Sequence, residues 1–259
     1  MKNTLFDLSG KSALVTGSSR GIGKAIATRL AQHGANVVVS GRRIETCAAT
    51  VREIEALRGP AWGRVWGQAA NIAQQEDLLR LVEGAVQQFG PLDILVCNAA
   101  INIHVGPTLG LGEAALRKVL EANMMSLYWL TRAVIPAMLE RRAGRIILVA
   151  STAGLTGGGA SLSYGMSKAA GMNAMQTLAV ELGPAGICCN SIAPGLIETD
   201  MTRPMMARPG VLDTYLARSP ARAPGVPDDI AGVAVFLASR AGAHLNGQTL
   251  VVDGGYTIA

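Results

Sequence analysis

Short apolar runs recur along the chain, separated by longer stretches in which apolar positions repeat with a helical period. The short runs are continuously apolar and rich in Val and Ile, which is typical of parallel strands covered on both faces. They predict six strands and a weaker seventh near Ala61–Gln68. The six are Ser12–Thr16, Asn36–Ser40, Leu92–Cys97, Arg145–Ala150, Ile187–Ile192 and Thr249–Val252.

The longer stretches have the spacing of amphipathic helices, and several end at glycine, a natural helix stop. We expect Pro136 to bend or break the longest of them. Strands that alternate with helices along the whole chain predict an α/β, doubly wound Rossmann fold with a seven-stranded parallel sheet. The predicted helices are Ile22–His33, Gln75–Phe89, Leu116–Arg141, Tyr164–Leu182 and Asp228–Ser239.

The composition limits the number of domains and the compartment. The chain has 259 residues, 49% hydrophobic and 16% charged, which is enough for one large core and too little for two. We therefore expect residues 1–259 to form a single domain. Asp7 interrupts the apolar segment that a secretory signal would need, and no apolar run approaches the roughly 20 residues of a membrane span. These features predict a cytoplasmic protein with no membrane partner.

The charged and metal-ligating residues exclude two further classes. The formal net charge is +5, but the Lys and Arg residues are scattered, so we expect no nucleic-acid partner. The four cysteines and three histidines show no spacing typical of metal ligands. The sequence therefore predicts reduced thiols and no metal site.

A glycine-rich turn follows the first predicted strand, with the sequence Thr-Gly-Ser-Ser-Arg-Gly-Ile-Gly. Its glycines let the backbone turn sharply and approach a pyrophosphate, whose charge the next helix N-terminus stabilises. Such a turn can be merely structural, but its place between a strand and a helix favours a dinucleotide site. The predicted cofactor contacts in it are Gly17, Ser19, Arg20, Gly21, Ile22 and Gly23.

The end of the second predicted strand indicates which dinucleotide binds. NAD-preferring folds usually have Asp or Glu there to bind the ribose hydroxyls. This strand ends instead in Ser40-Gly41-Arg42-Arg43, and guanidinium groups can bind a 2′-phosphate that a carboxylate would repel. The sequence thus predicts NADP(H) in preference to NAD(H). The alternative, that these are solvated surface charges, fits Arg43 better than Arg42.

Tyr164 and Lys168 form a candidate acid/base pair, because a spacing of four residues places them on one helical face. A free tyrosine titrates near ~10. A neighbouring ammonium group and an oxidised nicotinamide would both favour the phenolate. Such a pair can protonate a carbonyl oxygen or take a proton from an alcohol. The Tyr-x-x-x-Lys spacing alone is a common coincidence, so its weight depends on other motifs.

Further motifs accompany this pair in a fixed order along the chain. They are the glycine turn, Asn98-Ala99, Asn123, Ser151 and Pro194-Gly195. In order and spacing they resemble the short-chain dehydrogenase/reductase family, from Gly10 to about Tyr256.

The resemblance implies a role for each catalytic residue. Tyr164 would exchange a proton with the substrate oxygen, and Ser151 would hydrogen-bond that oxygen. Lys168 would bind the nicotinamide ribose and lower the pKa of the tyrosine. Asn123 would bend its helix and hold a water that leads to Lys168.

The resemblance also implies the remaining cofactor contacts, in three segments that follow the third, fourth and sixth predicted strands. The first segment would flank the adenine, and the second would lie beside the adenosine ribose. The third would seat the nicotinamide carboxamide through Ile197 and its phosphates through Thr199. The residues are Asn71 and Ile72, then Asn98, Ala99 and Ala100, then Pro194, Gly195, Ile197 and Thr199.

The sequence departs from the family in two places. Cys97-Asn98-Ala99-Ala100 replaces the usual Asn-Asn-Ala-Gly, where we expect a local change in packing. Val180 stands where the family's acyl-carrier-protein reductases usually have a basic docking residue, which weakens that assignment and leaves it open. The segment that begins at Cys97 is closer to carbonyl reductases that act on retinoid-like and other hydrophobic ketones.

Loops beyond the strand ends should select the substrate, a small carbonyl compound or alcohol. The methionine-rich segment Met201–Tyr215 predicts a mobile apolar lid and favours a hydrophobic ketone or secondary alcohol. The same side chains could instead cover the core or a subunit interface. The other candidate segments are Ile101–Val105, Thr152–Gly159, Leu162 and Leu196.

Two alternatives remain for the function, and the resemblance predicts an assembly. A 3-oxoacyl-carrier-protein reductase is one alternative. A dinucleotide-binding sensor or scaffold without turnover is the other, and it predicts damage to a Ser–Tyr–Lys set that is intact here. We expect a homodimer or homotetramer formed through the two long helices. The apolar side chains Met124, Met125, Leu127 and Trp129 fit either that interface or the core.

Overall fold

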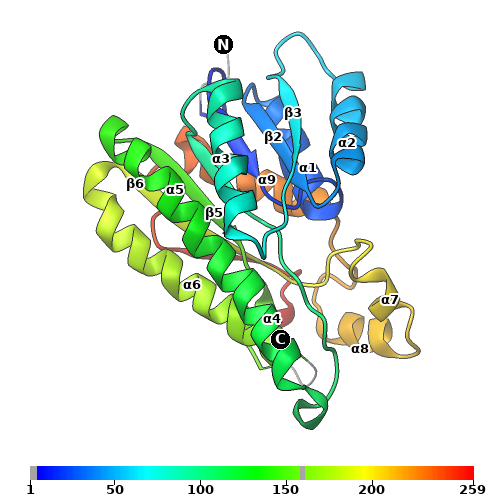
Figure 1. Cartoon of the computed structure of the whole chain (residues 1–259). Helices are drawn as coiled ribbons and strands as arrows, with labels where there is room; N and C mark the ends of the chain where they lie inside the picture. The colour runs from blue at the N-terminus through cyan, green and yellow to red at the C-terminus, as the bar shows by residue number, and fades with distance from the viewer. Residues whose placement is uncertain (1–4, 158–160) are drawn as a thin grey trace.

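The computed structural model describes residues 5–157 and 161–259, within which seven parallel strands form a central sheet (Figure 1). The strand order is β3-β2-β1-β4-β5-β6-β7, which confirms the predicted doubly wound fold. The winding direction reverses between β1 and β4, and ligands of such folds bind at the carboxyl ends of the strands at this point. The strands are β1 Ser12–Val15, β2 Asn36–Gly41, β3 Val65–Ala69, β4 Ile94–Cys97, β5 Gly144–Val149, β6 Ile187–Pro194 and β7 Thr249–Val252.

Helices cover both faces of the sheet, and each face has its own apolar core. Successive side chains of a strand point to opposite faces. Ala13 and Val15 of β1 therefore pack in one core, and Leu14 packs in the other. Helices α1 (Gly21–Gln32), α2 (Ile44–Ala56) and α9 (Pro227–Ala238) contribute to the first core. Helices α3 (Gln75–Phe89), α5 (Ser126–Arg141) and α6 (Leu162–Leu182) contribute to the second and lie in front of the sheet in Figure 1.

The long helix predicted at Leu116–Arg141 is interrupted around Asn123, where the family resemblance implied a bend, and not at Pro136. It consists of α4 (Glu113–Leu120), a π-helical turn (Glu121–Met125) and α5. The predicted break at Pro136 is wrong, because α5 continues through this proline. Four side chains of α5 around it are buried against the sheet, and their burial outweighs the one backbone hydrogen bond that proline removes.

Three helices were not predicted from the sequence. Helix α2 buries only Cys47, Thr50 and Ile54, so its apolar stripe is short and includes a polar residue. The other two are α7 (Arg203–Met206) and α8 (Val211–Arg218), which bury none of their side chains among the described residues. Helix α7 is a single turn, and the short apolar stripes of α2 and α8 were not recognised as helical in the sequence.

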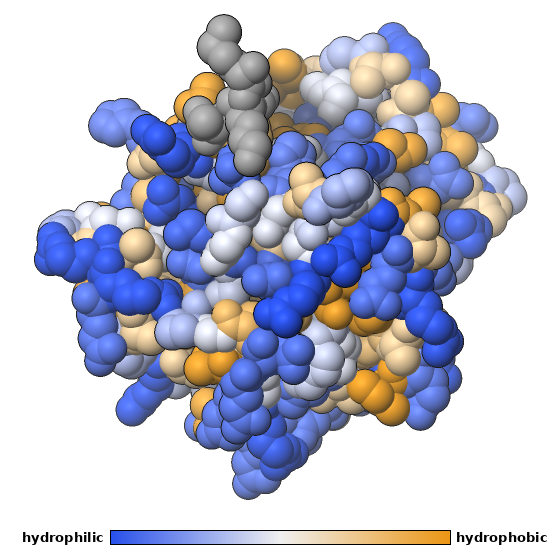
Figure 2. All heavy atoms as spheres, turned by 90° about the horizontal axis from the view of Figure 1, so that it is seen from above, coloured by the Kyte–Doolittle hydropathy of each residue, from blue (hydrophilic) through white to orange (hydrophobic). Residues whose placement is uncertain are grey.

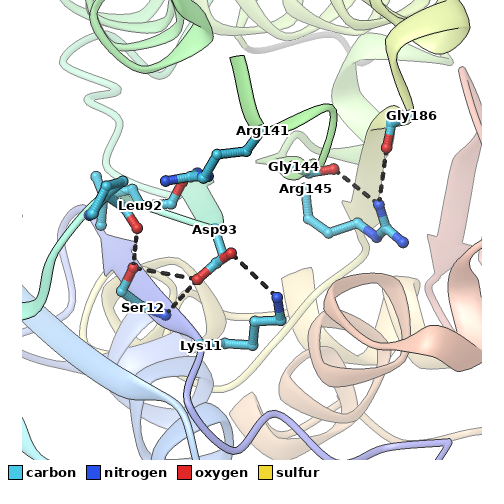
Figure 3. A network of polar contacts seen from close by, with 9 residues as sticks. Lys11, Ser12, Leu92, Asp93, Arg141, Gly144, Arg145 and Gly186 are labelled. Carbon is cyan, nitrogen blue, oxygen red and sulfur yellow. Dashed lines mark hydrogen bonds and ion pairs between the residues drawn. The ribbon is translucent and has the colours of Figure 1, made fainter. Parts of the chain in front are cut away.

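Polar contacts connect the strands at their amino ends, opposite the ligand-binding end (Figure 3). The Asp93 carboxylate accepts hydrogen bonds from the Ser12 N–H (3.0 Å) and from the Lys11 ammonium (3.2 Å). Arg141 donates to the Leu92 carbonyl (2.6 Å). Seen from above in Figure 2, the end that carries the N-terminus in Figure 1 is largely hydrophilic, with small separate apolar patches.

Within the described ranges, no helix is long and apolar enough to cross a membrane, and no group of His, Cys, Asp and Glu could hold a metal ion. The four cysteines are buried and free of disulfides in the same part of the chain. The first four residues, used above in judging the secretory signal, lie outside the described residues, as do positions 158 and 159 of the candidate substrate segment Thr152–Gly159.

Candidate active site

The glycine turn connects β1 to α1 and has the backbone geometry that a phosphate site requires. Gly17 and Gly21 have φ values of 63° and 54°, a left-handed conformation that favours glycine. A Cβ at Gly23 would lie 2.4 Å from the Gly17 carbonyl oxygen, so only glycine fits there. Among the described residues, no side chain caps α1 and no acidic residue lies in its first turn. The positive end of this helix is thus open, and the turn fits a pyrophosphate.

The turn is held against the end of β4. The Asn98 side-chain amide donates to the carbonyl oxygens of Thr16 (2.9 Å) and Gly17 (3.1 Å). The Thr16 hydroxyl accepts in return from the N–H groups of Asn98 and Ala99, each at 3.1 Å. A Cβ at Gly17 would lie 2.9 Å from Ala99. The predicted contacts Asn98 and Ala99, with Ala100 next in the chain, therefore lie beside the turn.

The predicted 2′-phosphate residues lie in two different environments. Arg42 and Arg43 follow β2 and are exposed, and no acidic partner contacts either of them within the described residues. The Arg20 guanidinium instead lies 3.9 Å from the Asp200 carboxylate, which also pairs with Arg203 at 3.1 Å. Arg20 therefore connects the glycine turn to the segment after β6.

The remaining predicted cofactor residues lie at three strand ends. Ser19 packs against the end of β2, where a Cβ at Gly41 would lie 2.7 Å from its hydroxyl oxygen. Asn71 follows β3, and its side-chain oxygen accepts from the Ala73 N–H (3.2 Å), so the amide closes its own turn. Ile72 packs against the second core. Pro194, Gly195, Ile197 and Thr199 lie at and after the end of β6, and the Thr199 side chain is the nearest neighbour of Gly21.

Ser151, Tyr164 and Lys168 come together at the carboxyl end of β5 and the first turns of α6. The Ser151 side chain lies close enough to the Tyr164 phenol to lower its pKa. The Lys168 ammonium lies 5.4 Å from the centre of the Tyr164 ring and donates to the Val149 carbonyl oxygen at 2.7 Å. Lys168 is only 5% exposed. Ser151 and Tyr164 can therefore act on one substrate oxygen, and the Lys168 ammonium lies beside the tyrosine ring.

In the protein without bound cofactor, burial determines the protonation states of Tyr164 and Lys168. It raises the pKa of Tyr164 to about 12, although the neighbouring Ser151 side chain acts in the opposite direction. It also lowers the pKa of Lys168 to about 8. Both shifts disfavour a charged side chain in surroundings that exclude water. Tyr164 is thus a neutral phenol at neutral pH, and the phenolate considered above needs a further positive charge nearby.

Asn123 lies in the π-helical turn between α4 and α5, and its side chain holds the segment after β4. Its amide oxygen accepts from the Ile101 N–H (2.8 Å), and its amide nitrogen donates to the Ile101 carbonyl (3.0 Å). The same nitrogen donates to the Ser167 hydroxyl (3.0 Å), which donates to the Tyr164 carbonyl (2.8 Å). This contact was not predicted, because only the folded chain brings Asn123 to Ile101. The sequence signal that could have identified Ser167 is its position: it directly precedes Lys168 and lies on the same helical face as Tyr164.

Exposed apolar side chains occur in the segments that follow β4, β5 and β6. Several residues of the predicted substrate segments are exposed, whereas Leu196 is buried. The exposed ones include Ile103, Val105, Leu155, Leu162 and Met201. Of the predicted interface residues, Met124 and Met125 are exposed, Leu127 is buried in the second core, and Trp129 packs partly against it.

The chain is similar to proteins that carry out oxidation and reduction. A family model described as enoyl-(acyl carrier protein) reductase matches residues 17–257. The human dehydrogenase/reductase SDR family member 4 is 38% identical over 248 residues, which are 96% of this chain and 88% of that protein. The 3-oxoacyl-[acyl-carrier-protein] reductase of Vibrio cholerae is 36% identical over 249 residues, 96% of this chain and 98% of that protein.

A solved structure shares the whole architecture. It is a 7α-hydroxysteroid dehydrogenase complexed with NADH and 7-oxo glycochenodeoxycholic acid, at 34% identity and a TM-score of 0.92. The match covers 98% of this chain and 97% of that one.

Proposed function

Because the chain belongs to the short-chain dehydrogenase/reductase family and is an oxidoreductase acting on CH–OH groups, we propose that it uses NADP(H) to interconvert a ketone or aldehyde and its alcohol. The observation that carries the proposal is the cluster of Ser151, Tyr164 and Lys168 at the carboxyl end of β5. A sensor or scaffold would not require a serine and a tyrosine side by side with a buried lysine next to them.

Tyr164 is the proton donor in the reducing direction. Its pKa of about 12 keeps the phenol protonated at neutral pH, and Ser151 holds the carbonyl oxygen beside it. Bound NADPH supplies the hydride. The Lys168 ammonium, charged below pH 8, uses one N–H for Val149 and retains others for the ribose hydroxyls. In the oxidising direction the phenolate is needed, and the charges of Lys168 and the oxidised nicotinamide would favour it.

Arg42 and Arg43 support NADP(H) as the cofactor. The hydroxysteroid dehydrogenase holds NADH, so family membership alone leaves the choice open. Both arginines are exposed at the end of β2, and no carboxylate neutralises them within the described residues. Arg42 is the principal 2′-phosphate ligand in this proposal. Arg20 can reach the phosphate only by leaving Asp200.

A hydrophobic ketone or secondary alcohol is the proposed substrate class. Apolar side chains such as Ile103, Leu155 and Met201, in the segments after β4, β5 and β6, are exposed at 49%, 47% and 58%. The 7-oxo bile acid of the similar structure is also a largely apolar ketone.

A 3-oxoacyl-carrier-protein reductase is the second candidate, and the Vibrio cholerae relative favours it. The exposed position of Val180 on α6 argues against it, since a basic residue is expected there for docking an acidic carrier protein.

We further propose that residues 1–259 work as one catalytic unit in the cytoplasm, without nucleic-acid or membrane partners. The unit assembles as a homodimer or homotetramer through α5 and α6. Met124 and Met125, exposed at 38% and 37% beside α5, support this assembly.

The test is turnover with NADPH and NADH over hydrophobic ketones, the matching secondary alcohols and a 3-oxoacyl thioester. Tyr164→Phe should lose at least ~100-fold in turnover and still bind NADPH, because it removes the proton donor alone. Tyr128→Phe, on the exposed face of α5, is the matched control. Turnover retained by Tyr164→Phe would refute the mechanism, and NADPH binding without turnover of any substrate would favour the sensor.

A further inference from the structure

The backbone after β6 leaves one N–H group available at the proposed nicotinamide site. Three N–H groups of this loop donate to neighbouring elements: Gly195 to the Val252 carbonyl (2.9 Å), Glu198 to the Gly225 carbonyl (2.8 Å) and Thr199 to the Thr202 hydroxyl (3.0 Å). The Leu196 N–H donates to the phenolic oxygen of Tyr215 (3.1 Å). Counting only described residues, the Ile197 N–H has no partner. A buried N–H is normally paired, so this one is available to a ligand.

The neighbouring contacts determine where this free N–H points. The Leu196 carbonyl accepts from the Gly225 N–H at 2.9 Å. That carbonyl and the Ile197 N–H belong to one peptide group, which is planar and trans, so the two point in opposite directions. Gly225 therefore directs the Ile197 N–H away from itself, and Tyr215 fixes the preceding peptide.

Tyr215 lies in the second half of α8. Its hydroxyl binds the Leu196 N–H, as a backbone carbonyl of a neighbouring strand would. Its hydroxyl accepts from the Leu196 N–H and donates to the Asp253 carbonyl at 3.2 Å, just after β7. A Cβ at Gly195 would lie 2.7 Å from this hydroxyl, so the contact is close. Hydrogen bonding between β6 and β7 is thus continued past the strand ends by a side chain.

The Tyr215 ring is itself held by the segment after β7. It stacks on the Tyr256 ring, with centroids 4.4 Å apart and planes at 10°. The Arg218 guanidinium lies 4.5 Å from the centre of the Tyr256 ring. The Asp253 carboxylate accepts from the N–H of Thr257 (2.8 Å), which fixes this turn. The segment predicted as a mobile lid is therefore attached to the sheet at its Tyr215 end.

We propose that Tyr215 is a positioning residue for the nicotinamide ring, acting through the Leu196 peptide to present the Ile197 N–H to the carboxamide. The inference rests on the proposed dinucleotide function. Tyr215 is far from the glycine turn in the sequence, and in this proposal it affects only the nicotinamide end of the cofactor.

The test measures binding of two ligands that differ by the nicotinamide alone. These are NADPH and 2′-phospho-ADP-ribose, titrated against the wild-type chain and Tyr215→Phe. We expect Tyr215→Phe to bind NADPH about tenfold more weakly, to bind 2′-phospho-ADP-ribose unchanged, and to lose ten- to about a hundredfold in kcat through misplacement of the ring. Thr131→Ala, which removes a buried hydroxyl of α5 outside the site, is the control for general destabilisation and should leave the ratio of the two Kd values unchanged.

Variants of Tyr256 provide a second readout. Tyr256→Leu removes the stacking and should shift the Kd ratio in the same direction, whereas Tyr256→Phe keeps a ring and should restore the wild-type ratio. Equal weakening of both ligands by Tyr215→Phe, or no change in either, would overturn the inference. If the wild-type chain instead prefers NADH, the proposed cofactor is wrong, and the same comparison with NADH and ADP-ribose still decides the role of Tyr215.

Discussion

Replacing Lys168 by methionine should stabilise the protein while weakening its binding of cofactor. Burial lowers the pKa of this ammonium from 10.5 to about 8, and the side chain is 5% exposed. At 1.36 kcal/mol per pKa unit, that fall corresponds to about 3 kcal/mol of unfavourable free energy in the folded protein at neutral pH. Methionine removes the charge at similar length, but the Val149 carbonyl loses its donor, which costs about 1 kcal/mol. We expect Lys168→Met to raise the free energy of unfolding at pH 7 by about 2 kcal/mol.

The pH dependence separates this effect from a general gain in packing. Above pH 8 the folded chain loses the Lys168 proton while the unfolded chain keeps it up to about 10.5. The unfolded state then binds more protons, so the wild-type stability rises with pH. The pKa values of Cys97 and Cys189 are raised from 9.0 to about 12, and that of Tyr164 from 10.0 to about 12. These groups lower stability as the pH rises above 9, so the clear window is pH 8 to 9.

Urea unfolding at pH 7, 8 and 9 measures both effects. The advantage of Lys168→Met should be largest at pH 7 and shrink by about 1 kcal/mol between pH 8 and 9. Lys118→Met, at an exposed position of α4, is the matched control and should show neither change. NADPH titration should show weaker binding by Lys168→Met at pH 7, and wild-type affinity that falls as the pH passes 8. A variant no more stable than the wild type, with a difference independent of pH, would refute the assignment of the cost to a buried ammonium.

Two further substitutions test the cofactor and substrate ends of the site. Arg42→Ala should weaken NADPH binding about tenfold, because a charged hydrogen bond is lost, and should leave NADH binding unchanged. Arg43→Ala is the comparison. If titrations with both cofactors show an unchanged preference for NADPH, Arg42 is not part of the site. Asn123→Ala should lower the free energy of unfolding by about 1–3 kcal/mol, because it leaves both backbone groups of Ile101 without their partner. It should also raise the KM for the carbonyl substrate while the Kd for NADPH stays constant, and steady-state kinetics in which only kcat changes would contradict this role.

The sequence predicted the fold because the signals involved are local and repeated. Apolar runs and helical periods gave the seven strands in their correct places and α3 to the residue. The short helices α7 and α8 were not predicted, because their apolar residues were interpreted as a lid; they bury no side chain within the described ranges. The break at Pro136 was predicted from a local rule that burial of α5 against the sheet overrides.

The site was predictable where one residue type does one task and not where residues act in pairs. The order and spacing of several motifs together predicted Ser151, Tyr164 and Lys168 as one group, and these side chains lie together in the folded chain. The contacts from Asn123 to Ile101 and from Tyr215 to Leu196 join segments whose meeting depends on the whole chain. Desolvation also cannot be determined from spacing, which is why the pKa of Tyr164 in the protein alone is raised and not lowered.

The buried cysteines can be used to measure local unfolding of the protein. Cys97 and Cys189 are 6% and 0% exposed, and burial raises the pKa of each to about 12. Only a thiolate that solvent can reach reacts with an alkylating reagent, so labelling must wait until the surrounding core separates. Cys97 lies at the end of β4, close enough to Lys168 to feel its charge, and Cys189 lies within β6. The rate of alkylation at each cysteine, measured by mass spectrometry, would therefore give the frequency of local unfolding around β4 and β6 without the introduction of a probe residue.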